Sequence, residues 1–297
     1  MNRTDPTPVL VTGATGRIGR LVIDRLLDAG VPVRALVRRA GAAATLPAGV
    51  EVVTGDLTVP ESLDPALNGA GAVFLLWTAP PRTAPAVVGR LAARARRVVL
   101  LSSPIRTPHP FFQQPNPAAA LHAELERLIA ATGIESTVIR PGMFASNALA
   151  WWAPAIRAGE AVRWPYGAAA TAPVDDRDIA AVAAHALCRD GYTGGDFVLT
   201  GPESLTQAEQ VAVIGDALGR RIAFEEVTPD EFRSRWQGAA PGSAVDMLLA
   251  AWHAAVGRPA YVTSTVADLL GTPPRTFGRW AADHAAAFAP GAERQVL

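Results

Sequence analysis

The sequence has 297 residues, 49% of them hydrophobic, with 27 basic and 27 acidic side chains. This composition excludes a disordered protein, and the zero net charge gives no reason to expect nucleic acid or an anionic membrane as a partner. The one cysteine excludes an internal disulfide framework. No apolar run approaches membrane-spanning length, and the first residues lack the apolar core of a signal peptide. We therefore expect a cytoplasmic protein.

The N-terminal half alternates short apolar strands with helices. Strands are predicted at residues 9–12, 31–37, 50–53, 72–77, 97–101 and 137–140, and helices at 21–27, 61–67, 84–94 and 117–132. Strands this apolar are covered on both faces, and their alternation with helices predicts right-handed βαβ units. The fold class is therefore α/β, a Rossmann-type doubly wound parallel sheet.

After residue 141 the pattern becomes mainly helical. A helix at 179–188 and a strand at 197–199 are followed by helices at 207–218, 229–237, 244–255 and 277–288. We expect residues 1–141 to form the Rossmann core and residues 172–200 to rejoin it. Residues 142–171 and 201–290 are expected to form a smaller helical region, and residues 291–297 a flexible tail.

A glycine turn joins the first strand to the first helix. A G-x-x-G-x-x-G turn brings backbone amides and a helix N-terminus close to a pyrophosphate. In this strand–turn–helix context it predicts a dinucleotide site. The residues expected to bind there are Gly13, Thr15, Gly16, Arg17 and Ile18, with Gly19 allowing helix and strand to pack.

The end of the second strand indicates which dinucleotide is bound. An acidic residue there would hold the ribose of NAD, whereas this chain has Arg34, Arg38 and Arg39. A guanidinium suits the 2′-phosphate of NADP, so Arg38 predicts NADP(H); alternatively, these arginines are solvated surface charges. Asp56 and Leu57 follow the third strand, where adenine would lie. Asp56 is alternatively the N-cap of a helix near residue 60.

The chain resembles the atypical short-chain dehydrogenases of the NmrA-like group. The motifs that carry the resemblance are the glycine turn, the strand that ends at Arg38, Gly55-Asp-Leu57, Leu101-Ser-Ser103, the run 133–142 and the run 173–180. The resemblance implies that Ser102, Ser103, Pro141, Met143 and Phe144 lie near the nicotinamide. It also implies that residues 229–255 form a helical lid over a substrate-binding region. The group includes reductases, isomerases and redox-sensing regulators.

The usual proton relay of short-chain dehydrogenases, a tyrosine four residues before a lysine, is absent. The chain has no lysine, and none of its three tyrosines lies on the helix at 117–132. His122 lies on that helix, four residues before Glu126. Since residues so spaced share a face, Glu126 is expected to orient His122 and raise its pKa, which would make it a proton donor. Alternatively His122 binds the cofactor ribose or is a surface residue. Ser102 and Ser103 are further candidates to polarise a carbonyl, and no metal site is expected.

The leading hypothesis is an NADPH-dependent reductase of a ketone or quinone, acting on a bulky aromatic secondary metabolite as in antibiotic biosynthesis. An apolar pocket for a flat small molecule is expected from aromatic and methionine side chains, although aromatics are also common core residues. These are Trp77, Phe111, Phe112, Met143, Trp151, Trp152 and Trp164. The alternatives are a non-catalytic NADP-binding redox sensor with a protein partner, and an isomerase. Either a monomer or a homodimer is compatible with the sequence.

Overall fold

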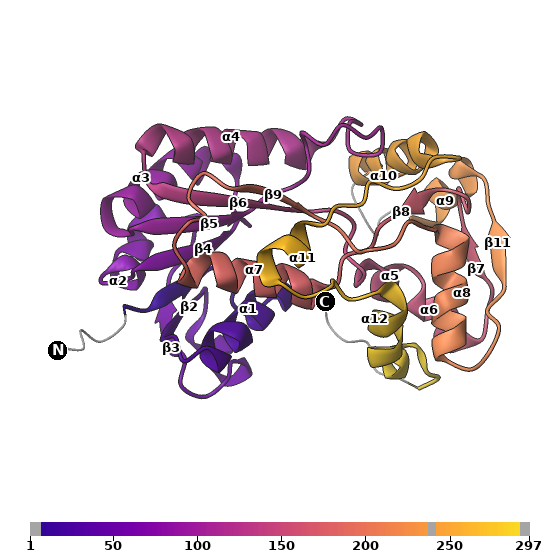
Figure 1. Cartoon of the computed structure of the whole chain (residues 1–297), viewed down its shortest axis with the longest axis horizontal. Helices are drawn as coiled ribbons and strands as arrows, with labels where there is room; N and C mark the ends of the chain where they lie inside the picture. The colour runs from indigo at the N-terminus through magenta and orange to yellow at the C-terminus, as the bar shows by residue number, and fades with distance from the viewer. Residues whose placement is uncertain (1–6, 237–241, 292–297) are drawn as a thin grey trace. The chain divides into compact units, whose positions relative to one another are not determined.

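Seven strands form one sheet within residues 7–236 and 242–291, the part of the chain that the computed structural model describes (Figure 1). The strands are β1 (Val9–Val11), β2 (Val33–Val37), β3 (Glu51–Thr54), β4 (Ala72–Leu76), β5 (Arg97–Leu101), β6 (Glu135–Pro141) and β9 (Asp196–Leu199). Their order is β3-β2-β1-β4-β5-β6-β9, and all pairs from β3 to β6 are parallel. The predicted Rossmann-type sheet is confirmed.

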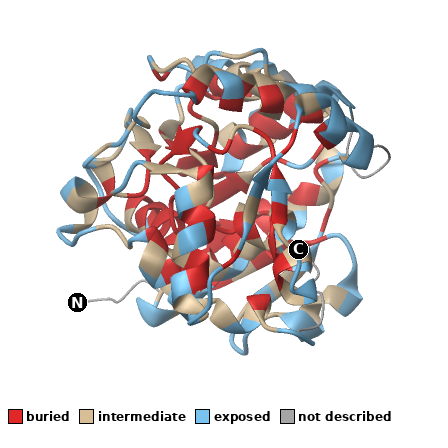
Figure 2. Ribbon diagram, turned by 90° about the vertical axis from the view of Figure 1, so that its right-hand side faces the viewer, coloured by how far each residue is buried: buried red, intermediate tan, exposed pale blue. Residues whose placement is uncertain are grey.

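Helices cover both faces of this sheet. They are α1 (Arg17–Asp28), α2 (Asp64–Leu67), α3 (Ala84–Arg94), α4 (Pro117–Thr132) and α7 (Asp176–Cys188), with short 3-10 turns η1 (Ala40–Thr45), η2 (Pro60–Leu63) and η3 (Pro81–Thr83). Helix α1 packs against α7, while apolar side chains of α2, α3 and α4 share a core with the opposite face of the strands. The central strands β1 and β5 are wholly buried, as the apolar strand pattern requires. Helices in Figure 2 change from buried to exposed within a turn, which is the amphipathic pattern.

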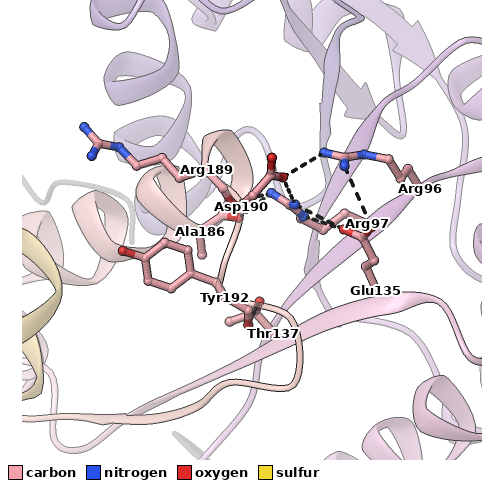
Figure 3. A network of polar contacts seen from close by, with 8 residues as sticks. All are labelled: Arg96, Arg97, Glu135, Thr137, Ala186, Arg189, Asp190 and Tyr192. Atoms are coloured by element: carbon pink, nitrogen blue, oxygen red, sulfur yellow. Dashed lines mark hydrogen bonds and ion pairs between the residues drawn. The ribbon is translucent and has the colours of Figure 1, made fainter.

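A buried arginine ties α7 to the starts of two strands (Figure 3). Arg97, the first residue of β5, donates to the carbonyl oxygens of Ala186 and Arg189 at 3.3 and 2.5 Å. The same guanidinium pairs with Glu135 at 3.1 Å and Asp190 at 2.6 Å. A cation beside the last carbonyls of a helix stabilises it, so this contact fixes the helix at the amino-terminal edge of the sheet.

The chain divides into two units. The first comprises residues 1–103, 118–141 and 176–197, and the second comprises residues 104–117, 142–175 and 198–297. From the sequence we expected boundaries at 141, 172 and 200, with residues 104–117 in the Rossmann core. Residues 292–297 of the predicted tail lie outside the described residues, as does residue 237 of the predicted helix at 229–237.

The second unit is mainly helical around an aromatic core. Its helices are α5 (Asn147–Trp151), α6 (Ala153–Ala158), α8 (Gln207–Ala217), α9 (Pro229–Trp236), α10 (Gly242–Ala255), α11 (Thr265–Leu270), α12 (Phe277–Asp283) and the 3-10 turn η4 (Ala285–Phe288). Strand β7 (Val162–Trp164) pairs with β11 (Phe224–Glu226), and β8 (Ala170–Thr171) with β10 (Leu205–Thr206). Trp164 packs against Phe232 and Trp252 at ring distances of 4.8 and 5.5 Å. None of the described helices has the length and apolarity needed to cross a membrane.

Candidate cofactor and active site

The glycine turn lies between β1 and α1, with its backbone held from several sides. Thr12 Oγ1 donates to the carbonyl oxygen of Leu76 at 3.0 Å and accepts from the N–H of the same residue at 2.8 Å, which ties β1 to β4 just below the turn. Arg20 Nε donates to the carbonyl oxygen of Thr15 at 2.9 Å. Helix α1 has no side-chain cap and no acidic residue in its first turn. Its positive end is therefore left to an external anion.

The turn fits a pyrophosphate because its three glycines lack side chains, which would crowd the backbone at these positions. Gly13 has a φ of +63°, which side chains rarely tolerate. A Cβ on Gly19 would lie 2.2 Å from the carbonyl oxygen of Gly13, and one on Gly16 would lie 3.2 Å from the same atom. These glycines keep the amides of the turn accessible, as a dinucleotide requires. Thr15 and Gly16 are exposed, Arg17 is half-buried and Ile18 is buried.

The three arginines of the second strand have different roles. Arg34 is committed to the fold: it pairs with Glu51 at 2.8 Å and donates to the carbonyl oxygens of Ala66 and Asn68. Arg38 and Arg39 are exposed just past the end of β2, and among the described residues neither has a side-chain partner. Two unpaired guanidinium groups at this strand end suit the 2′-phosphate of NADP.

Replacing Arg38 by alanine is expected to weaken NADPH binding about tenfold while leaving NADH binding unchanged, because only NADPH has the phosphate. Quenching of intrinsic tryptophan fluorescence measures both dissociation constants without any substrate. Arg25→Ala removes a guanidinium in the last turn of α1, at the opposite end of the helix from the glycine turn, and serves as the control for a general loss of positive charge. Equal weakening of NADPH and NADH in R38A would contradict the assignment.

Asp56 and Leu57 follow β3 as predicted. Asp56 Oδ1 accepts the N–H of Thr58 at 2.8 Å, and the backbone N–H of Asp56 donates to Ser62 Oγ at 2.8 Å. The alternative of an N-cap is wrong, since η2 begins at Pro60 after Val59 without a side-chain cap. Leu57 is 6% exposed and belongs to the core of the first unit.

A buried ion-pair network lies at the ends of β5 and β6. Arg140 donates to the two carboxylate oxygens of Glu126 at 2.7 and 2.8 Å, and also binds Asp196. Ser102 Oγ donates to Glu126 at 2.5 Å, and Arg140 donates to the carbonyl oxygen of Ser103 at 3.0 Å. Burial opposes the charge of Arg140, but its hydrogen bonds to Glu126 and Asp196 raise the pKa of this guanidinium. The network holds α4 to both strand ends, and it engages the hydroxyl of Ser102.

His122 lies beside this network but is bonded to a different residue than expected. Its Nδ1 is 2.8 Å from Ser103 Oγ, whereas Glu126 faces Arg140 and Ser102. Burial lowers the pKa of His122, the charge of Glu126 raises it, and that of Arg140 lowers it further, with a net decrease. The expected rise in the pKa of His122 is therefore wrong in direction, because desolvation outweighs the carboxylate. The imidazole is neutral at neutral pH and is a weak proton donor.

This lowered pKa predicts a pH-dependent stability. The unfolded chain takes up a proton on His122 near pH ~6.5, but the folded protein does so only at lower pH. The stability that the neutral His122 side chain contributes is therefore fully present above about pH 6.5. It is lost as the pH falls toward the pKa of His122 in the folded protein. We expect the melting temperature of the wild type to fall more between about pH 7.5 and 5.5 than that of His122→Gln. Burial also lowers the pKa of His185. Because His185 is present in both proteins, its effect on the melting temperature cancels in this comparison. Parallel melting curves would contradict this prediction.

The residues proposed for a substrate pocket are placed in different surroundings. Trp152 and Trp164 are 1% and 4% exposed in the aromatic core of the second unit, which Trp151 packs against. Trp77 is buried in the core of the first unit, and its Nε1 donates to the carbonyl oxygen of Ala79 at 2.6 Å. Met143, by contrast, lines a recess of the second unit.

This recess contains further residues that carry no signal in the sequence. Its lining residues include Phe111, Phe112, Met143, His109, Thr200 and Tyr261. Phe111 and Phe112 were expected to line a pocket, whereas His109, Thr200 and Tyr261 come from distant parts of the chain without a local motif. Arg140 was also missed as a structural residue, although an arginine that directly follows Val138 and Ile139 near the end of a predicted strand is a signal for a buried ion pair. Pro141 is buried at the end of β6, and Phe144 forms a bridge to Val174.

Comparisons with known proteins agree with this geometry. Residues 13–189 match the model of a protein family described as NAD(P)H-binding. A (4-alkanoyl-5-oxo-2,5-dihydrofuran-3-yl)methyl phosphate reductase from Streptomyces griseus subsp. griseus is 40% identical over 288 residues, which cover 95% of this chain and 99% of the relative. An NAD(P)H azoreductase from Xenophilus azovorans is 32% identical, covering 94% of this chain and 99% of the relative.

A solved structure shares the fold. The NADPH-dependent quinone oxidoreductase QOR2 of Escherichia coli, crystallised with NADPH, superposes with a TM-score of 0.77. The match covers 93% of this chain and 99% of that chain at 24% identity. At this identity the likeness concerns the fold alone, and that fold extends over both units.

Proposed function

The chain belongs to a family of NAD(P)H-binding oxidoreductases of the atypical short-chain dehydrogenase type, and on that premise we propose that it reduces conjugated, electron-poor carbonyl compounds. NADP(H) is the cofactor, and when bound it supplies the hydride. Gly13, Gly16 and the amino end of α1 would hold its pyrophosphate, and Arg38 its 2′-phosphate.

The observation that carries the proposal is that the candidate proton donors near the ends of β5 and β6 are either engaged in hydrogen bonds or weakly acidic. Ser102 donates to Glu126, and Glu126 is paired with Arg140. Burial lowers the pKa of His122, which leaves this imidazole neutral at neutral pH. The sequence has no lysine to complete a tyrosine–lysine relay. The first unit therefore offers no strong general acid among these residues.

The lack of a strong general acid favours an acceptor whose reduced form delocalises its negative charge. Addition of hydride to a simple ketone produces an alkoxide, a strong base that needs a positioned acid in the transition state. Addition to a quinone or to an alkene that bears acyl groups produces a phenolate or enolate, in which the negative charge is delocalised. Such an acceptor needs hydrogen bonds more than a strong acid.

The two curated relatives support the same chemistry. The name of the Streptomyces relative describes a ring alkene that carries an alkanoyl group and is conjugated with a ring carbonyl. The other relative is named for azo compounds, whose double bond is also conjugated. Of the predicted ketone or quinone substrates, we therefore retain the quinone class, extend it to acyl-substituted butenolides, and expect simple ketones to be poor substrates.

Oxidation of NADPH, followed by its absorbance with a panel of acceptors, tests the proposal. The panel contains a naphthoquinone, an acyl butenolide with and without a phosphate ester, and cyclohexanone as the matched simple ketone. We expect kcat/KM for the best conjugated acceptor to exceed that for cyclohexanone by about 1,000-fold, the contribution a missing general acid would make. Comparable rates for cyclohexanone would refute the acceptor class. Tight NADPH binding without turnover of any acceptor would favour a redox sensor instead.

A further inference from the structure

Strand β11 is hydrogen-bonded along one edge only. It lies beside β7 at the outer margin of the second unit (Figure 1). The N–H of Val162 donates to the carbonyl oxygen of Ala223 at 2.8 Å. Because alternate residues of a strand direct their backbone groups to opposite sides, residues 222, 224 and 226 face away from β7. Within the described part of the chain, the backbone groups of these residues form no hydrogen bond. Such an edge is a template for another strand.

The strand pattern begins before β11. Arg221, Ala223 and Glu225 are exposed, whereas Ile222 is buried and Phe224 is half-buried. Ile222 belongs to the aromatic core of the second unit, and Phe224 packs against it. This alternation places the side chains of residues 221, 223 and 225 on the outer face. The edge that another strand can use therefore extends over residues 221–226.

A groove lies beside this edge. Residues 219–224 form one part of its lining, and Ala208, Ala212 and Asp216 of α8 form the other. These three residues are four positions apart, so they share one face of the helix. The volume of the groove is about 930 Å³, within the ~300–1,000 Å³ of binding pockets. All of its lining residues belong to the second unit, and the groove leaves space for an added strand.

The edge carries opposite charges at its two ends. Arg221 is exposed, and the described residues provide no partner for its guanidinium. Glu225 is 3.6 Å from Arg163 on β7, and both side chains are about half exposed. Charges of one sign would repel a second copy of this edge. Opposite charges instead complement the same segment running in the other direction.

Symmetry restricts how two copies of this edge can pair. Across a two-fold axis the same edge faces itself, and the strands run antiparallel. Successive residue pairs then alternate between hydrogen-bonded and non-hydrogen-bonded types. Two symmetry-related pairs must be of the same type, so they cannot be adjacent. One residue must therefore lie directly opposite its own copy.

Only one such centre places unlike charges opposite each other. With Ala223 at the centre, Glu225 faces the partner's Arg221. With Phe224 at the centre, Glu225 faces the partner's Ala223, and with Glu225 at the centre the two carboxylates repel. Charge complementarity therefore selects Ala223.

This register also satisfies the backbone. Ala223 directs its carbonyl oxygen to β7, so its pair is of the non-hydrogen-bonded type. The two chains approach most closely there, and a methyl group suits that distance. Phe224 faces the partner's Ile222, and these residues exchange both of their hydrogen bonds. On the outer face, Arg163, Glu225 and the partner's Arg221 alternate in sign across three neighbouring strands.

We propose that β11 is the interface of a homodimer, in which a second copy of this chain adds residues 221–226 antiparallel to this edge, centred on Ala223. Because the edge is short, it buries less than the ~1,200–2,000 Å² of a stable interface. We expect reversible association with a dissociation constant on the order of 10 µM. Sedimentation equilibrium of the full chain measures it as a concentration-dependent rise from 31.0 kDa toward twice that mass.

Charge reversal tests the register. Arg221→Glu places a carboxylate opposite the partner's Glu225, and Glu225→Arg places a guanidinium opposite the partner's Arg221. Each variant alone is expected to raise the dissociation constant at least about tenfold. An equimolar mixture of R221E and E225R should regain the wild-type constant, because every facing pair then has unlike charges. Arg258→Glu reverses an exposed arginine elsewhere in the second unit and is the matched control.

Hydrogen exchange locates the interface independently. The amides of Ile222 and Phe224 have no acceptor in the monomer, but each donates to the partner in the dimer. We expect exchange of this segment to slow about fivefold between roughly 1 and 200 µM wild-type protein. The slowing should be clearly smaller in R221E and unchanged in R258E.

The outcomes decide the proposal. Recovery of the dimer in the mixture, with wild-type melting temperatures for both variants, would establish the pairing of Arg221 with Glu225. A wild type that stays monomeric up to roughly 500 µM would overturn the proposal, and its edge charges would then only prevent aggregation. A dimer that persists in R221E and E225R would overturn it as well, since its interface must lie elsewhere. Loss of the dimer in both variants without recovery in their mixture would refute the register.

Discussion

Replacing Arg140 by methionine is expected to be among the most destabilising single changes in the first unit. Arg140 and Glu126 are 2% and 8% exposed, so removal of the guanidinium leaves a buried carboxylate without its main partner. Breaking such a pair costs about 3–5 kcal/mol, which lowers the melting temperature on the order of 10 °C. Thermal unfolding followed by circular dichroism measures the loss.

Two further variants give this prediction its controls. Arg97→Met makes the same change at the other edge of the sheet, but there the partners Glu135 and Asp190 are 37% and 85% exposed. Their carboxylates stay solvated, so R97M should cost less and leave NADPH binding unchanged. In R140M/E126L the stranded carboxylate is also removed, and much of the lost stability should return. If R140M and R97M are equally destabilised, burial of the partner is not the cause.

Replacing Gly19 by alanine is expected to abolish tight NADPH binding. The added Cβ would lie 2.2 Å from the carbonyl oxygen of Gly13 and 2.7 Å from its carbonyl carbon. Since both are backbone atoms, the turn or the start of α1 must move, and the amides that would hold the pyrophosphate move with it. A cost on the order of 3 kcal/mol corresponds to a loss of affinity of roughly 100-fold. Titration calorimetry with NADPH measures it.

Gly89→Ala is the matched control for this substitution. Gly89 lies on α3, is exposed, and a Cβ there would meet nothing within 4 Å. The same methyl group should stabilise this helix by up to ~1 kcal/mol and leave NADPH binding unaffected. Wild-type affinity in G19A would mean that the turn is not the pyrophosphate site.

Elements with a strong local pattern were predicted well. The predicted helices at 84–94 and 117–132 and the strand at 97–101 coincide with α3, α4 and β5, because amphipathic or continuous apolar patterns specify these elements locally. The short strands β7, β8, β10 and β11 were not predicted. Each has two or three residues, too few for a periodic pattern, and each exists only through its pairing partner.

The hydrogen-bond partners of buried side chains could not be predicted from the sequence. The spacing of His122 and Glu126 predicts that they share a helix face, and helical geometry makes this correct. It does not predict that Arg140, from a neighbouring strand, holds the Glu126 carboxylate in two hydrogen bonds. A buried carboxylate pairs with the charge that best compensates its desolvation, and only the packed sheet brings that charge near.

The sequence by itself therefore determined the α/β class, the glycine turn and the arginines beyond β2, since each of these depends on residues close together in the chain. Only the tertiary structure decided which of those arginines is committed to the fold, how Glu126 is paired, and that His109 meets a segment 150 residues away. The physical reason is that burial and hydrogen-bond partners are properties of packed neighbours, and packing brings together residues whose local patterns carry no information about one another.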